Sequence, residues 1–583
     1  MTDEKMNYKM NVDISIDNSF YHEQFPRTLI LAPHPDDEIN LSANLINTFT
    51  LNKGEVFVAF ATNGDWNASP NIRIKEARAS LNILGVKNDN IIFLGYGDSW
   101  FSCKSKHMFY TDIGYVESKA GRVQTYACEG FVDYSYICNG KHRYYNVVDF
   151  CEDLIDLISN IKPELIVCVD YDEHPDHRML SICFERALSR ILKLNSQYRP
   201  EVLKRLAYPL AYCAASDYQL NNLSTRKPEV GDIDRYKGEI IGLNNFQWEK
   251  RIRLPITPNA ISNNFKRNIV ARALKCHKSQ YIFGRVGRIL NSDEVYWRRR
   301  TDNAAYTAKI ESTSGNPRYV NDFQLISATD IFELSPVFDD YYWSPDEKDV
   351  DKSISFEWDD QEVAYIKLFG NLGNQGKIEC LAISFDDGFY QEVGPFPDNG
   401  APIEVVLDKS HIIKKCTLTI KRFSGKEYGL AECEFYRSFC YKSCINPFIK
   451  IISDNHFIYN YYVSKKANSV KLDFYNYEVV DKAINLKVLK GESIIVNKTL
   501  VIDKRDKNIV IRADVETGNG RIYDQIVVTR VTNFFALNLI QVTKIRFIEF
   551  KVFLQKNRDD LFRYIKKYGL VETMKKILNR NRL

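Results

Sequence analysis

The first two hundred residues alternate between apolar runs and segments with helical spacing. Four short runs are almost entirely apolar, at residues 28–31, 55–61, 91–94 and 165–169. Between and after them, apolar side chains recur with the period of a helix, at residues 38–51, 72–84, 147–161 and 175–194. Strands that are apolar on both faces and separated by helices are typical of a parallel sheet covered on both sides. The pattern therefore predicts an α/β domain built on a mostly parallel sheet.

The pattern changes after about residue 300. Short β-branched or aromatic runs now follow one another with turn residues between them and without helices, which favours β-sandwich domains. We expect four units: an α/β domain at 27–305, a β-sandwich at 320–440, a second β-rich domain at 441–540, and a basic amphipathic helical tail at 541–583. The tryptophans of the first sandwich could stack on sugars, as in a carbohydrate-binding module, or fill its core.

Two polar segments directly follow apolar strands. Residues 34–38 read His-Pro-Asp-Asp-Glu after the run at 28–31, and residues 174–177 read His-Pro-Asp-His after the run at 165–169. The carboxyl ends of parallel strands share one edge of a sheet, where such folds bind ligands. Two histidines and one carboxylate with an open fourth position form a catalytic zinc site. The two segments together therefore predict a metal site, although each alone also fits a turn that caps a helix.

The spacing suggests different roles for the polar residues of these two segments. His34 and Asp37 are three residues apart and can face one point, whereas Asp36 between them is left to act on a metal-bound water. In the second segment, one of His174 and His177 can bind the metal while the other faces the substrate carbonyl. The loop at 99–146, which interrupts the α/β pattern, is expected to rim the site, with its His107 and His142 at the surface.

The residues from Ala32 to Glu38, with those from Glu173 to Arg178, resemble the LmbE/PIG-L family of zinc de-N-acetylases. Further similarities are Thr62-Asn63-Gly64, Arg73 with Glu76, and the segment His277-Lys278-Ser279-Gln280; the resemblance covers about residues 27–300. It implies a Rossmann-like fold for the α/β domain. Pro33 departs from the small residue that is common before the first histidine, which affects the turn and not the ligands.

The resemblance also implies a role for each site residue. His34, Asp37 and His177 would bind Zn²⁺, and Asp36 would be the general base. His174 would stabilise the oxyanion, and Asp176 would orient a neighbouring histidine. Arg73 would hold a polar or anionic part of the substrate; the alternative is a helix-surface residue that pairs with Glu76 or Glu38. Fe²⁺ or Co²⁺ would suit the same ligands.

The resulting expectation is a zinc-dependent hydrolase that removes the N-acetyl group from an N-acetylated amino sugar in a glycan or glycoconjugate, for example a cell-surface polysaccharide intermediate. One alternative is an amidase of the same fold that acts on a non-acetyl amide or a thiol conjugate. Another is a non-catalytic glycan-binding protein on this scaffold. All five polar residues His34, Asp36, Asp37, His174 and His177 are present, which argues against a scaffold that has lost catalysis.

Charge and cysteine content indicate which classes of partner the protein binds and in which compartment it works. The net charge of +4 divides into +8 for residues 544–583 and −4 for the remainder, so the globular part offers no basic surface for nucleic acid. The basic tail is a candidate for peripheral membrane contact or for contact within a biosynthetic complex. Thirteen scattered cysteines without a CxxC pair, and the absence of an apolar signal segment, favour a cytoplasmic protein that works at the inner face of the membrane if the tail binds lipid.

Overall fold

The computed structural model describes residues 25–207 and 252–441, the strands between 449 and 531, and residues 534–569. Within the first two ranges it leaves out residues 67, 99–106, 129, 173, 196, 256–257, 261–264, 291–292, 328–330, 332–340, 373–374, 399 and 440. The end of the predicted basic tail, residues 570–583, lies outside the described residues. Nine cysteines of the described part are free thiols, as their scatter along the chain predicts.

A seven-stranded sheet forms the first domain, in the order β3-β2-β1-β4-β5-β7-β6. The first five strands pair in parallel, and β7 pairs antiparallel with both β5 and β6. The strands are β1 (Thr28–Ala32), β2 (Val56–Thr62), β3 (Ile91–Tyr96), β4 (Leu165–Val169), β5 (Glu201–Arg205), β6 (Ile252–Pro255) and β7 (Asp293–Arg299). The predicted mostly parallel α/β fold is confirmed, and β1 lies directly beside β4.

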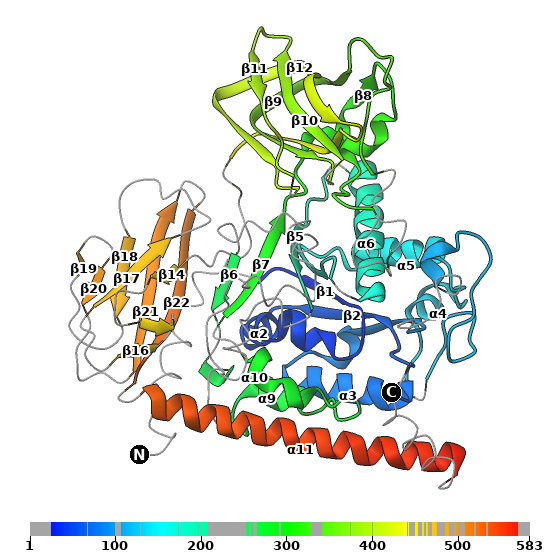
Figure 1. Ribbon diagram of the computed structural model, residues 1–583, viewed down its shortest axis with the longest axis vertical. Helices are drawn as coiled ribbons and strands as arrows, with labels where there is room; N and C mark the ends of the chain where they lie inside the picture. Colours follow the sequence, from blue (N-terminus) through cyan, green and yellow to red (C-terminus); the bar gives the residue numbers. More distant parts are fainter. Residues whose placement is uncertain are drawn as a thin grey trace.

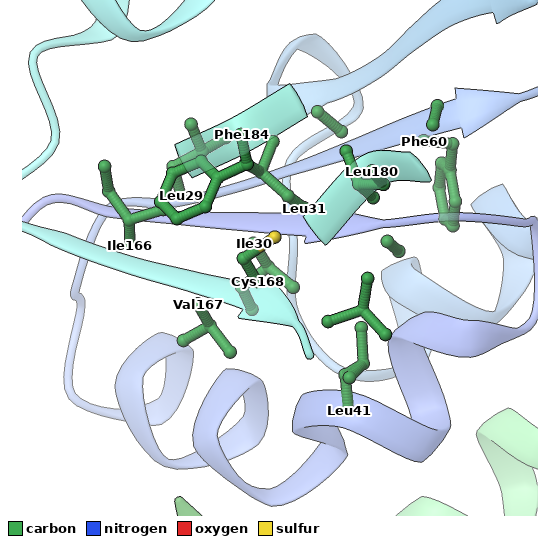
Figure 2. Close-up of a cluster of buried hydrophobic side chains, with 14 of the residues drawn as sticks. Leu29, Ile30, Leu31, Leu41, Phe60, Ile166, Val167, Cys168, Leu180 and Phe184 are labelled. Atoms are coloured by element: carbon green, nitrogen blue, oxygen red, sulfur yellow. The ribbon is translucent and has the colours of Figure 1, made fainter. Parts of the chain in front are cut away.

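Helices cover both faces of this sheet (Figure 1). They are α2 (Asp37–Leu51), α3 (Pro70–Ile83), α4 (Tyr134–Asn139), α5 (Val147–Ile161), α6 (Pro175–Leu194), α9 (Ile269–Leu274) and α10 (Val286–Ile289). Short 3₁₀ turns are η2 (Asn88–Asn90), η4 (Met108–Tyr110), η7 (Pro258–Ala260), η8 (Ile282–Arg285), η9 (Ala304–Thr307) and η10 (Pro317–Asn321). Figure 2 shows the core between sheet and helices, where Leu29 and Leu31 of β1 lie near Phe184 of α6. These apolar strands are buried on both faces, as parallel strands require.

An antiparallel sheet follows, in the order β11-β10-β12-β9-β13, with β8 paired to β9. Its strands are β8 (Lys309–Ser312), β9 (Ser353–Gly370), β10 (Gly376–Phe385), β11 (Tyr390–Val393), β12 (Ile403–Gly425) and β13 (Leu430–Tyr436). The short apolar runs at 353–358 and 363–369 suggested two strands where β9 is a single long one, and those at 403–407 and 416–420 suggested two where β12 is one. Register shifts in the pairing of β12 with β9, between Val406 and His411 and between Ile413 and Lys415, let the strands continue through the polar residues that interrupt the apolar pattern.

The third region contains two smaller sheets, ordered β14-β17-β20-β19 and β15-β16-β22-β21-β18. The strands are β14 (Ile449–Ile452), β15 (Phe457–Tyr459), β16 (Tyr462–Ser464), β17 (Ser469–Phe474), β18 (Ile484–Val488), β19 (Ile495–Val496), β20 (Thr499–Val501), β21 (Asn508–Thr517) and β22 (Gly520–Val531). The chain then forms the long helix α11 (Phe534–Tyr568). None of the helices in the described residues combines the length and apolarity needed to cross a bilayer.

The first domain and the antiparallel sheet are joined by a shared interior. The hydrophobic core of the first domain takes in Phe323, Ile326, Tyr341 and Phe369, which come from the second part of the chain. Buried charges also meet there. Arg299 of β7 lies 3.9 Å from Glu185 of α6 and 3.7 Å from Glu434 of β13.

Two carboxyls at this junction should make stability depend on pH. Burial raises the pKa of Asp322 to about 7, and burial, reinforced by Asp322 and Glu434, raises the pKa of Glu432 well above its usual range. Between about pH 4 and 7 the fold therefore keeps protons that the unfolded chain has lost, so stability falls as pH rises through this window. We expect a lower melting temperature at pH 8 than at pH 5.5, by about 2 °C or more. Thermal melts of the wild type, Asp322→Asn and the exposed control Asp346→Asn would check this.

Asp322→Asn should flatten the pH dependence, because the amide does not ionise, whereas Asp346→Asn should keep the wild-type slope. Equal slopes in all three proteins would contradict the assignment.

Candidate metal centre and active site

The turn between β1 and α2 carries the first half of the site. It is tied to the neighbouring strand, since the Thr62 N–H at the end of β2 donates to the Pro33 carbonyl at 3.0 Å. The His34 N–H donates to Asp37 Oδ2 at 3.2 Å. Asp36 has a φ of 146°, a conformation that L side chains rarely adopt and that stores strain of about 1–3 kcal/mol. The surrounding hydrogen bonds therefore hold Asp36 in a conformation that it would not take by itself.

The turn between β4 and α6 carries the second half. His174 caps α6, with Pro175 in the first turn, and its Nδ1 accepts the Asp176 N–H at 3.0 Å. Asp172 accepts the His174 N–H at 3.1 Å and lies 2.9 Å from His177 Nδ1. Sequence reasoning missed Asp172, although an acidic residue just after an apolar strand and five positions before a candidate ligand was a usable signal. A carboxylate on Nδ1 leaves the Nε2 lone pair of His177 for a metal.

Three donor atoms from the two halves form a tight triangle. His34 Nδ1 lies 3.0 Å from Asp37 Oδ2 and 3.2 Å from His177 Nε2. The distance from His177 Nε2 to Asp37 Oδ2 is also 3.2 Å. Atoms bound at about 2.0–2.2 Å to a tetrahedral ion lie about 3.3–3.6 Å apart, so a small widening of this triangle accommodates one divalent ion. All three side chains are buried, which keeps competing water away from the donors.

Further donors surround this triangle. Nitrogens of His34, His174 and His177 all lie within 4.8 Å of one another. A second, overlapping group consists of His34, Asp98, His174 and Asp176. Asp98 follows β3 and was not among the predicted site residues. The two predicted segments thus meet at one sheet edge, and the buried His/Asp cluster that they form is suited to a divalent metal.

His34 is also held on its other side. Asp176 Oδ2 lies 3.0 Å from His34 Nε2, and Asp176 Oδ1 lies 3.0 Å from His107 Nε2. The Phe109 N–H donates to His107 Nδ1 at 3.1 Å, so a neutral His107 carries its proton on Nε2 and donates it to Asp176. The predicted surface position of His107 is therefore wrong: its exposed fraction is 0%. The loop places this histidine inside the site instead of at its rim.

Arg73 orients Asp36. Its guanidinium donates to Asp36 Oδ1 at 3.1 Å and to the carbonyls of Pro35 and Gly64 at 2.8 and 3.2 Å. The side chain is buried, so the alternative of a helix-surface residue is wrong, while the predicted contact with substrate stays a prediction. A Cβ on Gly64 would collide with the guanidinium, so only glycine leaves room for Arg73 here. Asp36 keeps 18% of its side chain exposed and can meet a ligand.

Burial and neighbouring charge give the side chains different proton affinities. Burial raises the pKa of Asp36, and the Arg73 guanidinium opposes this shift. Burial acts on Asp37 in the same direction, but His177 and His34 outweigh it and hold the pKa of Asp37 well below its usual range. Burial, together with His34 and His177, lowers the pKa of His174 well below its ordinary value. One carboxylate is therefore firmly ionised, another is more basic, and the imidazole beside them is neutral.

A segment far along the chain supports the same turn. His277 Nε2 lies 2.6 Å from Glu38 Oε1, and both side chains are buried. Two residues later, the Ser279 hydroxyl donates to Glu76 Oε2 at 2.7 Å. The segment therefore ties the start of α2 to α3.

The family model of GlcNAc-PI de-N-acetylase (PIG-L) matches residues 29–188, the stretch that contains both halves of the site. The N-terminal region is a PIG-L/LmbE-like deacetylase domain. No curated protein matches the chain. The resemblance stated from the motifs is thereby confirmed for this region.

Three solved structures illustrate what parts of the chain are similar to. The N,N'-diacetylchitobiose deacetylase from Pyrococcus horikoshii is 19% identical, with a TM-score of 0.20, and the match covers 34% of this chain and 61% of that one. A deacetylase of the teicoplanin biosynthetic pathway is 13% identical, with a TM-score of 0.27, and the match covers 48% of this chain and 100% of that one. The family 32 CBM of NanJ from Clostridium perfringens is 18% identical, with a TM-score of 0.16 and coverages of 22% and 92%.

Proposed function

We propose that the PIG-L/LmbE-like domain is a zinc-dependent hydrolase that removes the N-acetyl group from an amino sugar within a glycan or glycoconjugate. The observation that carries this proposal is the meeting of the two His/Asp segments, which surrounds one possible ion position with His34 Nδ1, Asp37 Oδ2 and His177 Nε2. The match of residues 29–188 to a de-N-acetylase family supports the reaction class.

In this proposal His34, Asp37 and His177 hold the zinc. Zinc bound by two histidines and one carboxylate lowers the pKa of a coordinated water to about 7 and polarises a carbonyl group. Two further carboxylates position the ligand rings, because Asp172 lies on Nδ1 of His177 and Asp176 lies on Nε2 of His34. Such outer contacts fix the tautomer of each ring and raise its basicity.

Asp36 acts as the general base. Burial makes its carboxylate more basic than an exposed aspartate, while the hydrogen bond from Arg73 keeps one oxygen in a fixed direction. It would take a proton from the attacking water and later return it to the departing amine. Its partial exposure places it where a substrate can reach it.

His174 donates to the oxygen of the reacting carbonyl. Its Nδ1 is occupied as an acceptor by the Asp176 N–H, so the neutral ring carries its proton on Nε2. A donor held in place before the reaction stabilises the charge that develops as the amide carbon becomes tetrahedral. Asp176, two residues further along the chain, contacts His34 and His107 and keeps this part of the site rigid.

The test is acetate release from a panel of N-acetylated amino sugars and oligosaccharides, with metal content measured on the same preparation. We expect activity to disappear after chelation and to return with Zn²⁺, Fe²⁺ or Co²⁺ in an order that identifies the preferred ion. A folded protein with stoichiometric metal that releases no acetate from any acetylated glycan would overturn the sugar assignment. Activity that is insensitive to removal of the metal would overturn the mechanism.

A further inference from the structure

One side of α11 docks on the PIG-L/LmbE-like domain. In Figure 1 this helix runs along the outside of the domain, where it contacts η8. Ile545 is fully buried, and a Cβ on Gly284 of η8 would lie only 3.2 Å from Val552 Cγ1. The Tyr281 hydroxyl donates to Asp559 Oδ2 at 2.9 Å. Residues 545, 552 and 559 recur at intervals of seven, so they lie along one side of the helix and define its docked side.

The opposite side carries a row of exposed apolar side chains. Phe547, Phe550, Leu554 and Leu561 are 68, 57, 51 and 39% exposed. At 3.6 residues per turn, spacings of three, four and seven place them on one face, and Phe550 lies about 200° around the helix from Val552. We call these four residues the outward stripe. Phe553 and Phe562, 58 and 64% exposed, widen it on its two sides.

This stripe is not needed by the contacts that hold α11 in place. Soluble proteins scatter single apolar residues over their surfaces, but a continuous apolar face of this kind marks an interaction surface. Among the side chains of α11 that the structure describes, no other exposed face has this apolar character, because the side opposite the stripe is docked through Ile545 and Val552.

The charge beside the stripe indicates which surface it meets. Residues 543–568 contain eight Lys or Arg and three Asp or Glu, a net charge of +5. Arg546, Lys551 and Arg558 are exposed beside the stripe. Apolar side chains that enter the headgroup region, flanked by cations that meet lipid phosphates, are the features of a helix lying on an anionic membrane. A second copy of the chain would instead bring the same positive charge against this face.

We propose that the outward stripe and its basic flanks dock this protein on an anionic lipid surface, with α11 lying in the plane of the membrane. The helix is bound from both sides in this arrangement, by the deacetylase domain on one and by lipid on the other. Tyr281, which bonds to Asp559 of α11, lies four residues from His277, the partner of Glu38. The docked helix is thus connected directly to the segment that supports the start of α2.

Vesicle flotation of the full-length protein tests the proposal, with phosphatidylcholine vesicles and equimolar mixtures of phosphatidylcholine and phosphatidylglycerol. We expect binding to the anionic vesicles at least about tenfold stronger than to the neutral ones, and weaker binding as NaCl is raised. The triple variant Phe547→Ser, Phe550→Ser, Leu554→Ser should lose at least about tenfold in binding. Arg546→Gln with Lys551→Gln should lower binding to anionic vesicles alone.

The matched control is Ile113→Ser, Leu194→Ser, Val350→Ser, which changes three exposed apolar side chains outside α11 and should bind as the wild type does. Circular dichroism and thermal melts verify that each variant is folded. Failure of the wild type to float with anionic vesicles at low salt would overturn the proposal, as would wild-type binding by the stripe variant. Self-association of the wild type that the stripe variant abolishes, without vesicle binding, would assign the face to a second copy and overturn the lipid assignment.

Discussion

Replacing Asp36 by Asn is expected to lower kcat for deacetylation by about 10²–10⁴-fold while the metal content stays at the wild-type level. The amide cannot accept the proton, but its oxygen can still accept the hydrogen bond from Arg73 that now reaches Asp36 Oδ1, so the turn should keep its geometry. The measurement combines steady-state kinetics with metal analysis of the purified variant.

Asp37→Asn is the informative contrast. Asp37 Oδ2 is one corner of the donor triangle, so this variant should lose metal and activity together. If Asp36→Asn also came without metal, the two neighbouring aspartates would have to exchange roles. If Asp36→Asn kept kcat within threefold or so of the wild type, Asp36 would not be the base.

His107→Leu is expected to weaken metal binding by about 10–100-fold, because His107 contacts Asp176 and Asp176 in turn contacts the proposed ligand His34. Removing the imidazole leaves a buried carboxylate oxygen without that donor, and Asp176 is the group that holds His34 Nε2 at 3.0 Å. Competition with a chelating dye measures the dissociation constant of the metal directly, independently of activity.

Two further variants test whether the effect depends on the contact between His107 and Asp176. His107→Gln retains a donor and should recover part of the affinity. His142→Gln changes the other histidine of the same loop, which pairs with Asp133 and not with the site, and should bind metal as the wild type does. Metal affinity within about twofold of the wild type in His107→Leu would show that Asp176 holds His34 without help.

The α/β architecture was predictable because its strands are apolar on both faces, a pattern that few other arrangements produce. The convergence of the two His/Asp segments was predictable for the same reason, since both follow such strands. The order of the strands in the sheet was not predictable. β1 and β4 are neighbours because the chain crosses back over the sheet, and no local sequence pattern encodes this crossing. Their adjacency brings His34 and His177 within 3.2 Å.

The parts that sequence reasoning missed depend on contacts distant along the chain. His107 lies in a loop without periodic pattern, and its burial follows from Asp176, 69 residues away. Arg73 was expected to hold the substrate, and only the folded structure shows that it bonds to Asp36 and the Gly64 carbonyl. Residue type and local spacing therefore indicated which candidate donors converge, but not which groups orient them.

The shared interior between the first domain and the antiparallel sheet limits how this chain can be rearranged. Ending the chain after β7 would remove Phe323, Ile326, Tyr341 and Phe369 from the hydrophobic core of the first domain. It would also remove Glu434, which lies 3.7 Å from Arg299. The first domain therefore cannot be separated from the antiparallel sheet without exposing part of its hydrophobic core. Replacing the β-rich half by an unrelated domain would therefore require new residues on both sides of this shared interior at once.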